Sequence, residues 1–121
     1  MVRDMDLIRD ILRVIEQDPT FDNTQERTFP LEELGMDESR YDEVNYHVTL
    51  LVTSGFVNAT RCGLDMPWVR GLTWEGHELI ADISDPDVWA KTKERMKGLS
   101  GVGIAFAWEV AKSEIRKKLG L

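Results

Sequence analysis

Residues 44–57 read VNYHVTLLVTSGFV, an apolar run at helical spacing that stops at Ser54-Gly55 and resumes as a strand-like segment. The apolar positions that share one helix face are Val44, Val48, Leu51 and Val52. Such a stripe is typical of a helix with one side in the protein core. Glycine directly after the last turn favours a left-handed helix end. The stretch therefore predicts a helix that turns sharply into a strand.

The start of this helix is indicated by Ser39, which is followed three residues later by Asp42. This is the spacing of a capping serine with an acid in the first helical turn. We therefore predict a helix from Arg40 to about Thr53.

The residues before it predict an amphipathic first helix, whose apolar stripe is Met5, Ile8, Ile11, Leu12 and Ile15. This helix should end near Gln17, because Pro19 biases the residue before it away from helical geometry. Residues 21–25 are polar and turn-prone, whereas residues 29–36 are compatible with either a short edge strand or a helical turn. Periodicity does not separate these two alternatives in so short a run.

Downstream, residues 56–61 and 68–72 are strand-like and flank a loop-like insert, which predicts a hairpin with a broad tip. Thr73 then suits the cap of a helix through Ile83. Pro86 suits the first position of another helix. A final helix is expected over residues 102–119.

This order of elements is similar to the winged helix-turn-helix fold, with residues 40–53 in the place of the recognition helix and 56–72 as the wing. The phrase HVTLLVTSGFV resembles the His-Leu-x-x-Leu-x-x-x-Gly-Leu-Val signature of winged-helix regulators. Three segments, RDMDLIRDIL, YHVTLLVTSGFV and LTWEGHELIADISDPDVWAKTKE, more closely resemble a bacterial and prophage-associated family, domain of unknown function 2513. The resemblance covers most of residues 3–95.

The resemblance implies a winged-helix fold and a frequent mobile-element setting, without naming a substrate. The expected fold class is α+β, mainly α, with a winged helix-turn-helix core, a small β-hairpin wing and additional C-terminal helices. We expect residues 1–84 to form the winged-helix domain, and 85–121 a helical extension that packs on it as one structural domain. One departure is that Gly35 and His47 lie about three residues further apart than their counterparts in ordinary winged helices.

The charge of the chain is uneven, because residues 1–67 carry 6 Lys/Arg and 14 Asp/Glu within a total net charge of -7. The predicted helix offers neutral hydrogen-bonding side chains that suit base edges: Asn45, Tyr46, Thr49 and Thr53. Phosphate contacts normally need Lys or Arg, and Arg40 is the single cation of this approach. Six carboxylates surround it: Glu32, Glu33, Asp37, Glu38, Asp42 and Glu43. We call these six residues the acidic face.

Two functions follow from these charges. The first is a regulatory or accessory protein that binds double-stranded DNA through the wing, where Arg61 and Arg70 supply positive charge. The alternative is an adaptor that binds another protein with the acidic face of the winged-helix core. The shape predicts a DNA reader, whereas the electrostatics favour the adaptor.

Catalytic and metal chemistry find little support in the residues. Glu75, His77, Glu78 and Asp82 form an acid and histidine cluster, but they lack the zinc-binding HExxH spacing. No nucleophile-base pairing or phosphate-binding glycine loop is visible, so we expect no enzyme activity and no cofactor. His47 is interpreted as a structural histidine, and Cys62 as a small loop residue with no disulfide partner.

The last predicted helix is apolar on nearly every face over residues 102–110, which favours burial against a second copy. The expected homodimer contact is the stripe Ile104, Trp108, Ala111, Ile115 and Leu119. Core packing is the favoured role of the tryptophans Trp68, Trp74, Trp89 and Trp108. We read no membrane span and no export signal, so the expected location is cytoplasmic.

Overall fold

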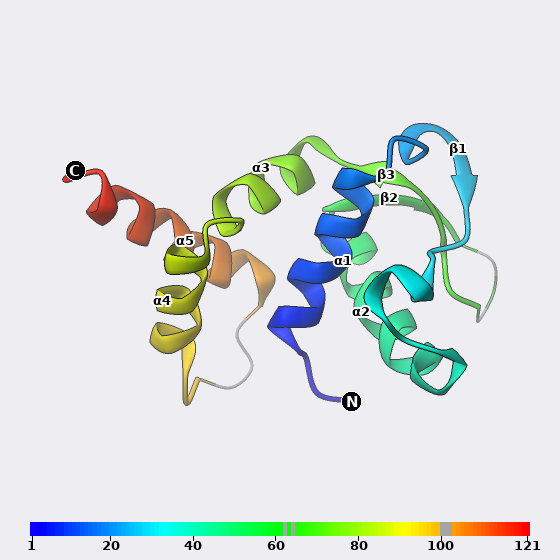
Figure 1. The fold of residues 1–121 in the computed structure, drawn as a ribbon, viewed down its shortest axis with the longest axis horizontal. Coiled ribbons are helices and arrows are strands. Elements are labelled where there is room, and N and C mark those ends of the chain that lie inside the picture. The colour runs from blue at the N-terminus through cyan, green and yellow to red at the C-terminus, as the bar shows by residue number, and fades with distance from the viewer. Residues whose placement is uncertain (62, 64, 100–102) are drawn as a thin grey trace. The chain divides into compact units, whose positions relative to one another are not determined.

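The computed structural model describes residues 1–61, 63, 65–99 and 103–121, and it shows a mixed α+β fold that is mainly helical (Figure 1). In chain order the elements are α1 (Met5–Gln17), β1 (Asp22–Arg27), η1 (Leu31–Leu34), η2 (Glu38–Arg40), α2 (Tyr41–Thr53), β2 (Val57–Thr60), β3 (Trp68–Leu72), α3 (Trp74–Ile83), α4 (Pro86–Met96) and α5 (Ile104–Lys118); η1 and η2 are short 3-10 helices. The chain forms two compact units, residues 1–77 and 78–121, with their boundary inside α3.

The core of the first unit is built by the apolar stripes of α1 and α2, which pack against each other. Predicted core residues from these helices are fully buried: Ile8, Ile11, Leu12, Ile15, Val44, Val48 and Leu51. Phe56 and Val57 continue the buried set into β2. Val52 is only half-buried, so the predicted stripe of α2 is one residue narrower than expected.

The hairpin after α2 is confirmed, because β2 and β3 pair in an antiparallel fashion. The predicted tip residues Cys62 and Leu64 lie outside the described residues. The strands that the structure describes form one antiparallel sheet in the order β1-β3-β2, which places β3 at its centre. β1 therefore pairs with β3 and not with β2, which follows it in the sequence.

β1 itself differs from the sequence expectation, which took residues 21–25 as turn-prone. Its six residues, DNTQER, are polar and largely exposed, so no apolar alternation indicated a strand. Asn23 has a positive φ of 69°, and the pairing register with β3 shifts between Asp22 and Arg27. The Asn23 side-chain amide donates to the carbonyl of Leu72 at 3.0 Å. Pairing with β3, and not its own hydrophobicity, holds this strand in place.

Two predicted helix caps give opposite outcomes. Ser39 does not cap α2: Asp37 accepts a hydrogen bond from the Ser39 backbone N–H at 2.9 Å, and the resulting 3-10 helix η2 runs directly into α2. The left-handed glycine is confirmed, with φ +85° at Gly55. There the Phe56 N–H donates to the Leu51 carbonyl at 2.9 Å, which is the Schellman closure of a helix end.

The second unit is a pair of packed helices, α4 and α5, joined to the end of α3. Asp85 caps α4 by accepting the Asp87 N–H at 2.8 Å, and Pro86 stands at the first helical turn as predicted. Trp108 on α5 donates to Asp82 on α3 at 2.7 Å. The first residue of the predicted final helix, Val102, lies outside the described residues. The core of the second unit is formed by buried apolar side chains from α3, α4 and α5: Leu79, Ile80, Ile83, Val88, Trp89, Ile104, Ala107 and Ala111.

Candidate functional site

The polar face of α2 carries the side chains that the sequence nominated for base contacts. Asn45, Tyr46 and Thr49 are half-buried, and Thr53 is exposed. Thr49 donates to the Asn45 side chain at 3.2 Å, and the Thr53 hydroxyl donates to the Thr49 carbonyl at 3.0 Å. The structure therefore brings all four residues onto one helix, but part of their hydrogen-bonding capacity is already used.

The two arginines of the β2–β3 hairpin that the sequence suggested for phosphate contacts differ in their surroundings. Arg70, on β3, forms an ion pair with Glu26 at 3.5 Å and donates to the Asn23 carbonyl at 3.1 Å. Its charge is therefore partly neutralised by β1. Arg61 follows β2 and is exposed. Within the described ranges it has no hydrogen-bond or ion-pair partner.

The acidic face gathers η1, η2 and the first turn of α2 on one stretch of chain, and five of its six carboxylates are exposed. Arg40 donates through Nε to Glu43 Oε2 at 2.5 Å, so the single cation of the approach is already paired. This hydrogen bond lowers the pKa of Glu43. The Ser39 hydroxyl and N–H likewise lower the pKa of Asp37. These two carboxylates remain ionised at neutral pH, and the face stays strongly negative.

Beside the acidic face lies a pocket of about 660 Å³, between the segment after β1, the two 3-10 helices and the start of β3. Its apolar lining includes Phe29, Pro30, Met36, Met66, Pro67 and Trp68, and acidic lining residues are Glu32, Asp37, Glu38 and Asp65. The Tyr41 hydroxyl, also in the lining, accepts the Met66 N–H at 2.9 Å and ties the hairpin to α2.

Sequence reasoning missed this pocket, because it assigned Trp68 to the core. The structure corrects that role: Trp68 is 40% exposed and Trp74 is 76% exposed, whereas Trp89 is buried. A possible signal was the apolar run Met66-Pro67-Trp68 after an acidic residue, since an apolar cluster beside a loop tip is unusual for a purely solvated turn.

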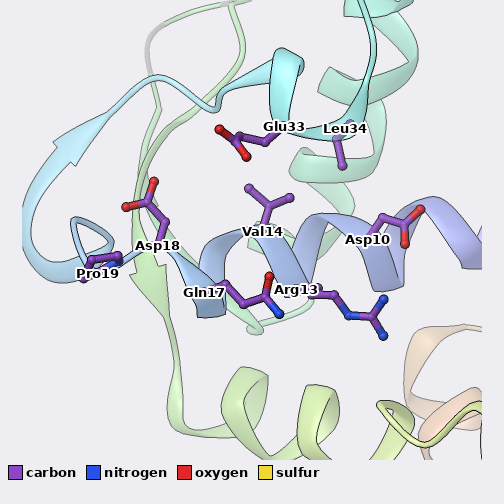
Figure 2. A pocket seen from close by; sticks show the side chains of 8 residues that line it. All are labelled: Asp10, Arg13, Val14, Gln17, Asp18, Pro19, Glu33 and Leu34. Atoms are coloured by element: carbon purple, nitrogen blue, oxygen red, sulfur yellow. The ribbon is translucent and has the colours of Figure 1, made fainter.

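A second pocket, of about 550 Å³, lies between α1 and η1. Figure 2 shows Val14 on α1 and Glu33 and Leu34 on η1 around it, with Asp18 at one end. Asp18 is already engaged, because it pairs with Arg27 at 3.1 Å. The lining of this second pocket mixes the apolar residues Val14, Pro19 and Leu34 with charged and amide groups: Asp10, Arg13, Gln17, Asp18 and Glu33. Sites for small molecules or side chains are usually more apolar, so this pocket is the weaker candidate.

The acid and histidine cluster around α3 does not assemble into one group. Among the described residues, no three such side chains are placed to hold a metal ion. Asp82 instead accepts the hydrogen bond from Trp108. No helix in the described part of the chain is long and apolar enough to cross a membrane.

The predicted dimer stripe is divided by the packing of α5 on α4. Ile104 and Ala111 are buried within the second unit, so they cannot form an open stripe with the others. Trp108 and Ile115 are half-buried, and Leu119 is 67% exposed. Of the five predicted residues, Trp108, Ile115 and Leu119 therefore keep exposed surface, and self-association through them stays a prediction.

Comparison with known proteins gives a family and one relative. The family model described as "Hypothetical protein (DUF2513)" matches residues 2–103, which confirms the resemblance seen in the sequence. A protein of Haemophilus influenzae named "Uncharacterized protein" is 33% identical over 103 residues, which cover 83% of this chain and 82% of that protein. No solved structure matches the chain.

Proposed function

Since this chain belongs to the DUF2513 family of hypothetical proteins, we propose from its own geometry that it is a winged-helix accessory protein whose acidic face binds a partner protein. The order helix, strand, helix, hairpin and the sheet order β1-β3-β2 support the winged-helix assignment. In that assignment α2 is the recognition helix and the β2–β3 hairpin is the wing.

The observation that carries the function is the pairing of Arg40 with Glu43 at the entrance to α2. A helix that enters a DNA groove normally has cations at this position to contact phosphates. Here the guanidinium is engaged by a carboxylate and surrounded by exposed acids. A negative surface repels DNA and attracts a basic protein surface, so it favours protein recognition in both rate and specificity.

The experiment is affinity capture from extracts of the native host, with the purified full chain as bait. A charge-reversed variant, Glu33→Lys with Asp42→Lys, should lose the captured partner. A matched variant, Glu16→Lys with Glu75→Lys, changes the net charge equally at exposed positions outside the acidic face and should keep it. Circular dichroism of all three chains verifies that each is folded.

A genome-wide DNA-binding selection with the same protein, at about 0.15 M salt, is run beside the capture. We expect no enriched sequence. Loss of the partner from both variants alike would show that binding follows net charge only, and would contradict a role for the acidic face.

DNA binding through the wing is the second candidate, and the exposure of Arg61 favours it. In this mode the wing supplies phosphate contacts while α2 contributes few. An enriched operator in the selection, together with retained binding by the charge-reversed variant, would replace the adaptor function by this one.

A further inference from the structure

The pocket beside the acidic face combines a buried apolar lining with an exposed aromatic wall. Phe29 and Met66 are buried, at 5% and 8% exposure, whereas Trp68 at the same pocket is 40% exposed. An exposed indole next to a concave apolar surface is the feature that anchors bound side chains at protein interfaces. The volume of about 660 Å³ lies within the range of sites that enclose a ligand group.

The charged residues around this apolar lining have mostly one sign. Glu32, Glu38 and Asp65 are exposed acids that line the pocket. Arg27 also lines it, but its guanidinium pairs with Asp18 at 3.1 Å. The pocket therefore offers a negative rim around an apolar interior, which complements an apolar side chain flanked by cations.

A hydrogen-bond donor adds directionality to the site. The Tyr41 oxygen accepts from Met66, which leaves its hydroxyl hydrogen to donate. Across the part of the chain that the structure describes, no group accepts it. A backbone carbonyl of a bound segment would suit this donor.

We propose that this pocket binds a short segment of another protein in which one apolar side chain, flanked by Lys or Arg, inserts against Trp68. The proposal rests on the proposed function and specifies the partner that the acidic face would recognise. The apolar side chain supplies contact with the indole, and the flanking cations meet the acidic rim.

The test uses the full chain, labelled with ¹⁵N, and an acetylated and amidated peptide, Arg-Lys-Gly-Leu-Gly-Lys-Arg, as the probe. The four indole N–H signals are assigned with single Trp→Phe variants. Titration should shift the Trp68 signal in a saturable manner while the signal of Trp74, which is exposed but outside the lining, stays in place. Replacing the central leucine of the peptide by serine should weaken binding about tenfold, since anchors carry most of the energy of such contacts.

Two triple variants separate the rim from general charge. Glu32→Gln, Glu38→Gln and Asp65→Asn removes three charges at the pocket and should weaken peptide binding about tenfold. Glu16→Gln, Glu75→Gln and Glu78→Gln removes three exposed charges outside both the lining and the acidic face and should change binding less than about twofold. Trp68→Ala should weaken binding at least about tenfold, with the fold verified by the remaining amide spectrum.

Several outcomes would overturn the proposal. One is a Trp68 signal that does not move at about 1 mM peptide, a concentration well above the dissociation constants of weak specific complexes. Another is equal weakening by the two triple variants, which would mean unspecific attraction to an acidic protein. If the chain self-associates and Trp68→Ala makes it monomeric, the occupant is a second copy and not another protein. If the host partner is lost on changing Glu33 and Asp42 while the peptide does not bind, the acidic-face function stands and the pocket assignment fails.

Discussion

The buried ring of His47 connects the backbone ahead of α1 to α2. Its Nε2 accepts the N–H of Asp4 at 2.8 Å, and its Nδ1 lies 2.7 Å from the carbonyl oxygen of Glu43. A backbone N–H can only donate and a carbonyl can only accept, so the proton must reside on Nδ1. The ring is fully buried and works as a structural, neutral histidine, as the sequence indicated.

We predict that His47→Ala lowers the free energy of unfolding by roughly 2 to 4 kcal/mol, because it leaves a cavity and an unpaired Asp4 N–H. His47→Gln retains a side-chain acceptor and should lose less. Urea denaturation of both variants measures the difference. An equal loss for alanine and glutamine would show that packing, and not the hydrogen bond, is the contribution of His47.

Gly76 in α3 lies against the backbone of Phe56, the residue that precedes β2. A Cβ at this position would lie 2.0 Å from the carbonyl oxygen of Phe56. Helix propensity alone predicts that Gly76→Ala stabilises the chain by about 1 kcal/mol. The close approach to Phe56 predicts the opposite sign, so that Gly76→Ala lowers the free energy of unfolding by at least about 2 kcal/mol. Thermal denaturation decides between the two signs, and a higher melting temperature for the alanine variant would contradict the packing.

Glu114 should make the second unit sensitive to acid. Its hydrogen bond from Arg95, with the charge of Lys117 nearby, holds its pKa below the ordinary value of 4.5. The stability from this carboxylate is therefore complete above the ordinary value, and is lost as the pH falls through the lower folded-state pKa. We predict that the free energy of unfolding of Glu114→Gln falls less steeply than that of the parent chain between about pH 5 and pH 3.

Measuring the free energy of unfolding at several pH values tests this prediction, and Glu94→Gln is the matched control. The Glu94–Lys97 pair is exposed on both sides, at 72% and 78%, so its loss should leave the pH profile almost unchanged. Identical profiles for the two variants would show that the Arg95–Glu114 pair does not account for acid sensitivity.

Any DNA affinity should depend on Arg61 and Arg70. The double variant Arg61→Ala, Arg70→Ala should abolish it, and affinity of the parent should fall steeply with salt, since acids surround α2. Titration of fluorescent duplex DNA at two salt concentrations measures both effects. Unchanged binding by the double variant, with loss on Asn45→Ala or Thr49→Ala, would restore base reading by α2.

Self-association should use the accessible end of the predicted stripe on α5. We expect the full chain to dimerise at micromolar concentration, and Ile115→Glu with Leu119→Glu to make it monomeric, because a buried charge would oppose the contact. Sedimentation velocity measures the state. Leu99→Glu places a charge at another exposed apolar residue and should leave the dimer intact. A monomeric parent chain would contradict the prediction.

The sequence by itself determined α1, α2, the β2–β3 hairpin and the helices after it, including Gly55 at its positive φ and Pro86 at the start of α4. These features are local: apolar spacing marks the buried face of a helix, and capping or breaking residues act within a few positions. The same local logic failed at Ser39, where Asp37 competes for the hydrogen bonds and starts a 3-10 helix instead.

Only the tertiary structure decided β1, the surroundings of the hairpin arginines Arg61 and Arg70, and the pocket at Trp68. β1 is polar and becomes a strand because β3 pairs with it. Arg70 is less available for phosphate contacts because it pairs with Glu26, which is 44 residues away in the chain. Trp68 becomes a pocket wall because Tyr41 holds the hairpin beside η2. Each depends on which distant residue arrives next to it, and pairings between distant residues leave no periodic trace in the sequence.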